Sequence, residues 1–193
     1  MSDHSGARVI DATEARVSTL RAKVGWLCQV IRVAAIVYAG WIIIWLVAGW
    51  SDERGIIERY GSFLHTDLAG MAGWQRALAF GIQFAIWLVT AAACISVWRL
   101  FTSYLNGHIF TVDAAVWLRR VALLGTIAKL ADIAARPLVS MIVTAHLPPG
   151  HRLFNVLFLP NDLLNLLFLV SLLALAQIFK VAAEIAEEQR QFV

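Results

Sequence analysis

Three long stretches of this chain contain no charged residue. They cover residues 33–50, 77–98 and 163–179, which is 18, 22 and 17 residues. A helix needs about 20 mostly apolar residues to cross the hydrocarbon core of a bilayer, because it rises about 1.5 Å per residue. The chain is 60% hydrophobic and 15% charged, whereas a soluble domain is about 45–50% apolar and about 25% charged. We therefore expect an integral membrane protein whose main partner is the lipid bilayer.

A fourth apolar stretch has the length of a membrane span but carries charges inside it. It covers residues 116–145 and contains Lys129, Asp132 and Arg136. We predict an all-α fold, a four-helix transmembrane bundle made by a single domain over residues 1–193. The predicted spans are residues 24–50, 77–98, 116–145 and 163–180. A short cytoplasmic helix from about residue 12 is predicted to lead into the first span, and residues 51–75 are predicted to form a loop.

The distribution of Lys and Arg predicts the orientation of these spans. The segment before the first span has four basic residues, and the region between the second and third spans has three against one acid. The first loop balances its basic residues with acids, and the third loop has one arginine. Cytoplasmic loops are enriched in Lys and Arg, so both chain ends are predicted to be cytoplasmic. The basic residues counted on that side are Arg8, Arg16, Arg21, Lys23, Arg99, Arg119 and Arg120.

The charges in the fourth stretch are the candidate ligand-binding site. Lys129, Asp132 and Arg136 are spaced so that they share one helix face, and we call them the charged stripe. Arg32 is predicted to lie at a similar depth, and three cations against one acid would leave a surplus positive charge for an anionic lipid or carboxylate. A structural alternative stays open, in which Asp132 pairs with Arg136 and Lys129 snorkels or bonds to Asn165 or Gln83. The candidate ligand-binding residues are Arg32, Lys129, Asp132 and Arg136.

Several classes of function are disfavoured by what the chain does not contain. It has no Ser-His-Asp set and no Gly-rich phosphate loop, so we expect no enzymatic activity. All five histidines fall in predicted loops, tails or span ends, where they cannot hold a haem between helices. Cys28 and Cys94 lack metal-ligand spacing, and no basic surface suited to nucleic acid is present. We expect no cofactor, no metal and no direct nucleic-acid partner.

Two segments of the chain resemble a known family. Gly107-His108-Ile109-Phe110-Thr111 follows the second span, with Leu118-Arg119 shortly after it. The end of the chain has a leucine-rich last span, Ile178-Phe179, and an acidic tail with Glu184, Glu187 and Glu188. In these features the chain resembles an uncharacterised bacterial membrane family, domain of unknown function 2975.

The resemblance implies a four-span protein of the bacterial inner membrane, often encoded beside a small helix-turn-helix regulator. It thus suggests a non-enzymatic sensory or regulatory membrane protein that holds a cytoplasmic regulator protein. Two alternatives stay open, a small transporter or anionic lipid-binding protein that uses the charged stripe, and an accessory subunit of a membrane complex. The predicted partner-binding residues are Gly107, Phe110, Thr111, Arg119, Glu184 and Glu188.

Overall fold

The part of the chain that the structure describes is almost entirely helical. The computed structural model describes residues 3–64, 70–106, 111–148, 152, 154 and 156–191, without the side chains of residues 3–24, 53, 59, 63, 64, 186, 187 and 189–191. Five helices lie in this part, and no strand occurs in it, so the prediction of an all-α fold is confirmed. The helices are α1 (Asp3–Ser51), α2 (Glu53–Leu64), α3 (Gly73–Leu105), α4 (Val112–Val143) and α5 (Pro160–Gln191).

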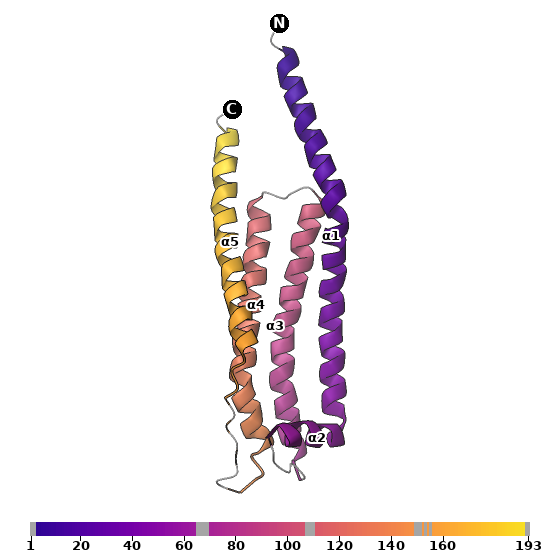
Figure 1. Cartoon of the computed structure of the whole chain (residues 1–193), viewed down its shortest axis with the longest axis vertical. Coiled ribbons are helices and arrows are strands. Elements are labelled where there is room, and N and C mark those ends of the chain that lie inside the picture. Colours follow the sequence, from indigo (N-terminus) through magenta and orange to yellow (C-terminus); the bar gives the residue numbers. More distant parts are fainter. Residues whose placement is uncertain are drawn as a thin grey trace.

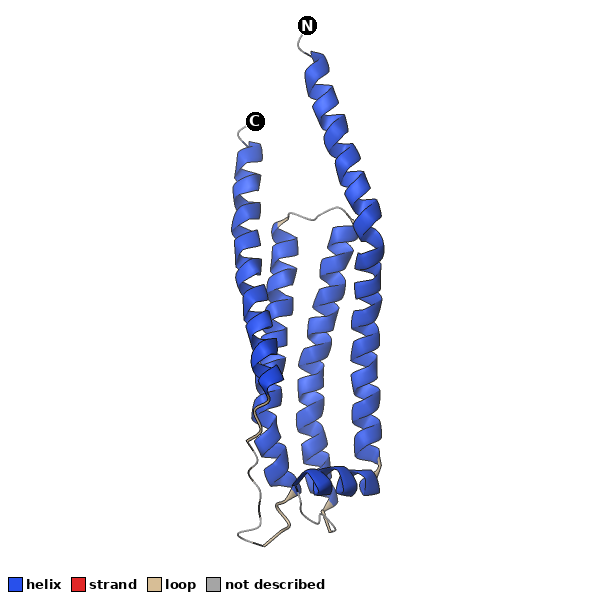
Figure 2. Ribbon diagram, in the orientation of Figure 1, coloured by secondary structure: helices blue, strands red, loops and turns tan. Residues whose placement is uncertain are grey.

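The four long helices form an open row. Helices α1, α3, α4 and α5 run side by side, and α2 lies across the end that is remote from the chain termini (Figure 1; Figure 2). Contacts join α1 to α3, α3 to α4 and α4 to α5, whereas within the described ranges none joins α1 to α5. The arrangement therefore differs from a closed four-helix bundle, because its first and last helices do not meet.

Three of the long helices are long and apolar enough to cross a membrane. They comprise residues Gly25–Ser51 of α1, Gly73–Leu105 of α3 and Pro160–Ile185 of α5. Many of their large apolar side chains are exposed, an arrangement that suits contact with lipid. Helix α4 has a similar length but carries the charged stripe. Both chain termini lie at the same end of the row (Figure 1).

Two predictions about the helices need correction. Helix α1 begins at Asp3, so the expected helix starts earlier than residue 12, although it does lead into the first span as predicted. The prediction of a loop over residues 51–75 was wrong, because α2 occupies much of it. Helix α2 is held by tertiary contacts: Ile56 is buried, and Gln83 accepts from Trp50 Nε1 at 2.9 Å while donating to the Tyr60 hydroxyl at 3.1 Å. A short, polar segment gives little sign of such contacts in its own sequence.

Small residues allow α4 to pack against two neighbours. Ala122, Ala128 and Ala135 are buried along it. A Cβ atom at Gly125 would lie 2.8 Å from Cδ2 of Leu169 on α5. Close approach of helix backbones through small side chains is a common way to pack helices in lipid. The position of α4 inside the row therefore depends on its small residues.

At the end of the row that carries α2, Gln75 connects the start of α3 to the end of α4. Its side chain is buried, and its Nε2 donates to the carbonyl oxygen of Ile142 at 2.7 Å. Its Oε1 accepts from the backbone N–H of Ala72 at 2.8 Å, at the N-cap of α3. One side chain thus satisfies the N–H at the start of α3 and links it to a carbonyl at the end of α4.

We predict that Gln75→Leu destabilises the protein by about 1–3 kcal/mol, because the partly buried N–H of Ala72 loses its partner. Gln177 on α5 is exposed, so Gln177→Leu is the matched control and should change little. Thermal unfolding in detergent, followed by circular dichroism, measures both variants. Equal midpoint temperatures for the two variants would show that Gln75 does not hold the helix ends together.

Candidate functional site

Four charged side chains from two helices meet on the inner face of α4. Lys129 Nζ lies 3.2 Å from Asp132 Oδ2 and 2.7 Å from Asp162 Oδ1. Arg136 Nη2 lies 2.8 Å from Asp132 Oδ2, and its two terminal nitrogens contact both oxygens of Asp162. We call these four residues the charged quartet. It extends the predicted charged stripe by one carboxylate from the first turn of α5.

Asp162 is the most deeply buried member of the quartet, with 2% of its side chain exposed. Its Oδ2 also accepts from the backbone N–H of Leu159 at 2.9 Å. Helix α5 begins at Pro160, so this bond satisfies the amide just before the first turn, as the acidic residue of a capping box does. Proline suits the first position of a helix because its missing N–H would have no partner there. Asp162 therefore sets the start of α5 and binds it to α4.

Arg136 supports a stretch of chain that is not helical. Residues 156–159 precede α5 without regular structure, and Arg136 Nη1 donates to the carbonyl oxygen of Leu157 at 3.0 Å. Irregular backbone at membrane depth is tolerated only where protein groups satisfy its polar atoms. Arg136 of α4 therefore stabilises the backbone that leads into α5.

The prediction that this cluster carries a surplus positive charge was wrong. Asp162 adds a second carboxylate, so the quartet has two cations and two anions. Arg32 is not part of it: its guanidinium carbon lies 4.0 Å above the Trp98 ring centroid, and its Nη1 donates to Gln29. A cation over an indole ring is stabilised without any carboxylate. The predicted set therefore divides into a neutral cluster and a separate arginine.

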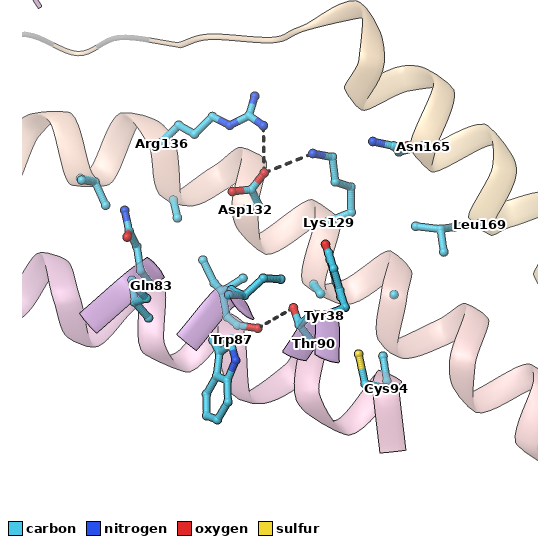
Figure 3. Close-up of a pocket in the computed structure, with 18 of the residues that line it drawn as sticks. Tyr38, Gln83, Trp87, Thr90, Cys94, Lys129, Asp132, Arg136, Asn165 and Leu169 are labelled. Atoms are coloured by element: carbon cyan, nitrogen blue, oxygen red, sulfur yellow. Dashed lines mark hydrogen bonds and ion pairs between the residues drawn. The ribbon is translucent and has the colours of Figure 1, made fainter. Parts of the chain in front are cut away.

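Three members of the quartet, Lys129, Asp132 and Arg136, lie in the wall of a cavity of about 820 Å³ that all four long helices line (Figure 3). Gly125 and Ser140 of α4 also line it, and the opposite face of α4 carries exposed apolar residues such as Leu123 and Leu130. Because α1 and α5 make no contact, no helix pair closes the cavity between them. Further lining residues include Tyr38, Ile42, Trp87, Cys94, Asn165 and Phe168.

The predicted partner-binding residues that the structure describes lie toward the end of the row opposite α2. Thr111 caps α4, its side chain accepting from the N–H of Ala114 at 3.3 Å. Arg119 is exposed, Glu188 is exposed, and Glu184 lies 3.5 Å from Lys180 Nζ. The two remaining predicted residues, Gly107 and Phe110, fall outside the described residues. The described members belong to the start of α4 and the last turns of α5, which face the end with both termini (Figure 1).

Asp162 is the site residue that sequence reasoning missed. It comes just before seventeen uncharged residues, a position typical of a helix cap. The signal for its other role was the imbalance of two cations and one acid inside the charged stripe, since an unpaired charge at that depth is costly. A carboxylate at the start of a neighbouring span is the natural partner for the extra cation.

Comparison with known proteins places most of the chain in one family. The family model described as "Protein of unknown function (DUF2975)" matches residues 60–192. No curated protein and no solved structure matches the chain. The matched range includes α3, α4 and α5, and with them all four residues of the charged quartet.

We predict that Asp162→Asn is much more damaging than Asp132→Asn, although each removes one negative charge. Asp162 is buried and receives four contacts, whereas 45% of the Asp132 side chain is exposed. Removing one partner of a buried ion pair strands the other, so the fall in midpoint temperature should be at least about twice as large for Asp162→Asn. Purified yield and thermal unfolding of the two variants provide the comparison. A larger loss for Asp132→Asn would mean that the quartet does not hold α5 in place.

Proposed function

Since the chain belongs to the family described as "Protein of unknown function (DUF2975)", we propose its function from the cavity: it is a membrane receptor for a lipid-like molecule. The observation that carries the proposal is the cavity of about 820 Å³ with one charged wall. Binding sites for small molecules have about 300–1,000 Å³, mostly apolar linings and a few placed polar groups. The cavity meets all three conditions.

Access from the bilayer supports a lipid-like ligand over a water-soluble one. The sides of the cavity are formed by membrane-capable helices, and α1 and α5 do not contact each other. A molecule already dissolved in the hydrocarbon can enter between these helices without crossing a polar surface. The proposed receptor therefore takes its ligand laterally from the membrane.

The proposed topology has four crossings of a bacterial inner membrane with both ends in the cytoplasm. The quartet supports α4 as a crossing helix, because ion pairing inside the protein lowers the cost of its charges at membrane depth. Basic residues in the first part of α1, in the last turns of α3 and near the start of α4 support the orientation. The common end of the two termini (Figure 1) agrees with an even number of crossings.

A cytoplasmic regulator protein is the proposed recipient of the signal, and the protein itself is proposed to be non-enzymatic. Both α1 and α5 continue beyond the ends of α3 and α4 on the side of the termini (Figure 1). The α5 extension carries the exposed Glu184 and Glu188, and the exposed Arg119 lies near the start of α4. Since the cavity is lined by α1 and α5, a ligand that changes their spacing would also move these extensions.

We predict that Ala93→Phe lowers the amount of lipid that co-purifies with the protein by about tenfold, because the ring fills space in the cavity. Ala93 lines the cavity, whereas Ala174 on α5 is exposed and lies outside the lining, so Ala174→Phe is the matched control. Extraction in mild detergent and mass spectrometry of bound lipids measure the effect. If Ala93→Phe retains as much lipid as Ala174→Phe and the original chain, with all three equally stable, the cavity is not the binding site.

We predict that a reporter fused to the C-terminus is active only in its cytoplasmic format, and that one inserted between α1 and α2 is active only in its periplasmic format. The reason is the excess of basic residues on the side of the termini. Paired alkaline phosphatase and fluorescent-protein fusions test both positions in intact cells. Phosphatase activity at the C-terminus would refute the proposed orientation.

A further inference from the structure

The wall of the cavity offers hydrogen bonding that the protein itself does not use. Asp132 is the exposed member of the quartet, and its Oδ2 accepts from both Lys129 and Arg136. Its Oδ1 receives no hydrogen bond from the residues that the structure describes. A carboxylate oxygen has lone pairs for two donors, so one acceptor position at the cavity surface is open.

Hydrogen-bond donors line the same cavity. Lys129 has three N–H bonds and uses two of them, on Asp132 and Asp162. Tyr38 and Asn165 also line the cavity, and neither side chain makes a hydrogen bond within the described part of the chain. Figure 3 shows the Tyr38 hydroxyl and the Asn165 side chain on the side of the cavity that holds Lys129. The open acceptor is thus accompanied by unused donors.

The charge of the wall limits what can occupy this position. The quartet has two cations and two anions in mutual contact, so it offers no net charge to a ligand. A charged head group would enter a medium of low dielectric without a counter-charge, which costs much more than burial of a paired polar group. The favoured head group is uncharged and both donates and accepts. A hydroxyl group is the simplest one that does so.

The apolar surroundings indicate the size of the rest of the ligand. The main cavity continues from the quartet along apolar residues that include Ile42, Val97 and Phe168. A second hollow of about 630 Å³ adjoins it and shares Ile42, Leu46, Tyr60 and Gln83 with its lining. Two adjoining hollows, one of them lined by Lys129, Asp132 and Arg136, suit a molecule with two hydrocarbon chains and one small head.

We propose that the ligand is a neutral diacylglycerol-type lipid. Its free hydroxyl donates to Asp132 Oδ1 and accepts from Lys129 or Asn165, and its acyl chains occupy the two hollows. The proposal rests on the proposed function and names the chemical class of that ligand. It also replaces the expected anionic lipid with an uncharged one, because the quartet favours an uncharged head group.

The test offers the purified protein an equimolar mixture of lipids with the same dioleoyl chains and different heads, and detects bound lipid by native mass spectrometry. The probes are dioleoylglycerol, its 3-O-methyl ether, dioleoyl phosphatidic acid and dioleoyl trimethylammonium propane. We expect dioleoylglycerol to be retained about tenfold more than each of the others. The methyl ether tests the donated proton, because it keeps the oxygen and loses the hydrogen.

Two substitutions test the role of charge. Asp132→Asn leaves the quartet with a net charge of +1 and should shift retention from dioleoylglycerol toward phosphatidic acid. Asn165→Leu keeps the charge and removes a hydrogen-bonding group at an exposed position on α5, so it should weaken dioleoylglycerol binding several-fold without that shift. Asn165→Leu carries the test if Asp132→Asn does not fold.

The outcomes separate the two proposals. Equal or stronger retention of phosphatidic acid, the trimethylammonium lipid or the methyl ether by the original chain overturns the diacylglycerol inference and leaves the lipid receptor standing. Retention of every probe at the level of the Ala93→Phe variant overturns the receptor proposal itself. An unchanged preference in Asp132→Asn, with that variant folded, overturns the argument that neutrality selects the ligand.

Discussion

The contact of Asp162 with Lys129 and Arg136 is the interaction on which the rest of this structure depends. It attaches α5 to α4, sets the first turn of α5, and supplies the second of the two negative charges that balance the two cations of α4. Through Arg136 it also holds the irregular backbone at Leu157. Without an acid on α5, the two cations of α4 would share the single carboxylate of Asp132, and unpaired charge in apolar surroundings is costly. Through these contacts the charges of α4 are balanced, and Arg136 also donates a hydrogen bond to the backbone that leads into α5.

The open row of helices has a direct consequence for ligand access. In a closed bundle of four helices, the interior fills with side chains from all sides. Here α1 and α5 make no contact, and the space between them stays partly empty because the lining of α3 and α4 includes small residues such as Ala93, Gly125 and Ala128. Small residues thus have two effects, since they bring neighbouring helices together and leave room on the inner face.

Prediction of the site from sequence succeeded for one helix and failed between helices. The spacing of Lys129, Asp132 and Arg136 placed them on one face, and they do share the cavity wall, because helical periodicity is a local property. The depth of Arg32 suggested the same site, but depth does not specify the direction of a side chain around its helix. Arg32 stacks on Trp98 instead. Asp162 joined the site through the packing of α5 on α4, which no local pattern encodes.

The sequence by itself determined the long helices, their membrane-compatible composition and the shared face of the charged stripe, because hydrophobicity and the helical repeat act over neighbouring residues. Only the tertiary structure decided that α2 is helical, that the row stays open, and that Asp162 makes the charged cluster neutral. Each of these depends on contacts between residues far apart in the chain: Ile56 and Tyr60 with α1 and α3, Gly125 with Leu169, and Asp162 with Arg136. The sequence contains the charged residues, and the packing of the helices determines which of them contact one another.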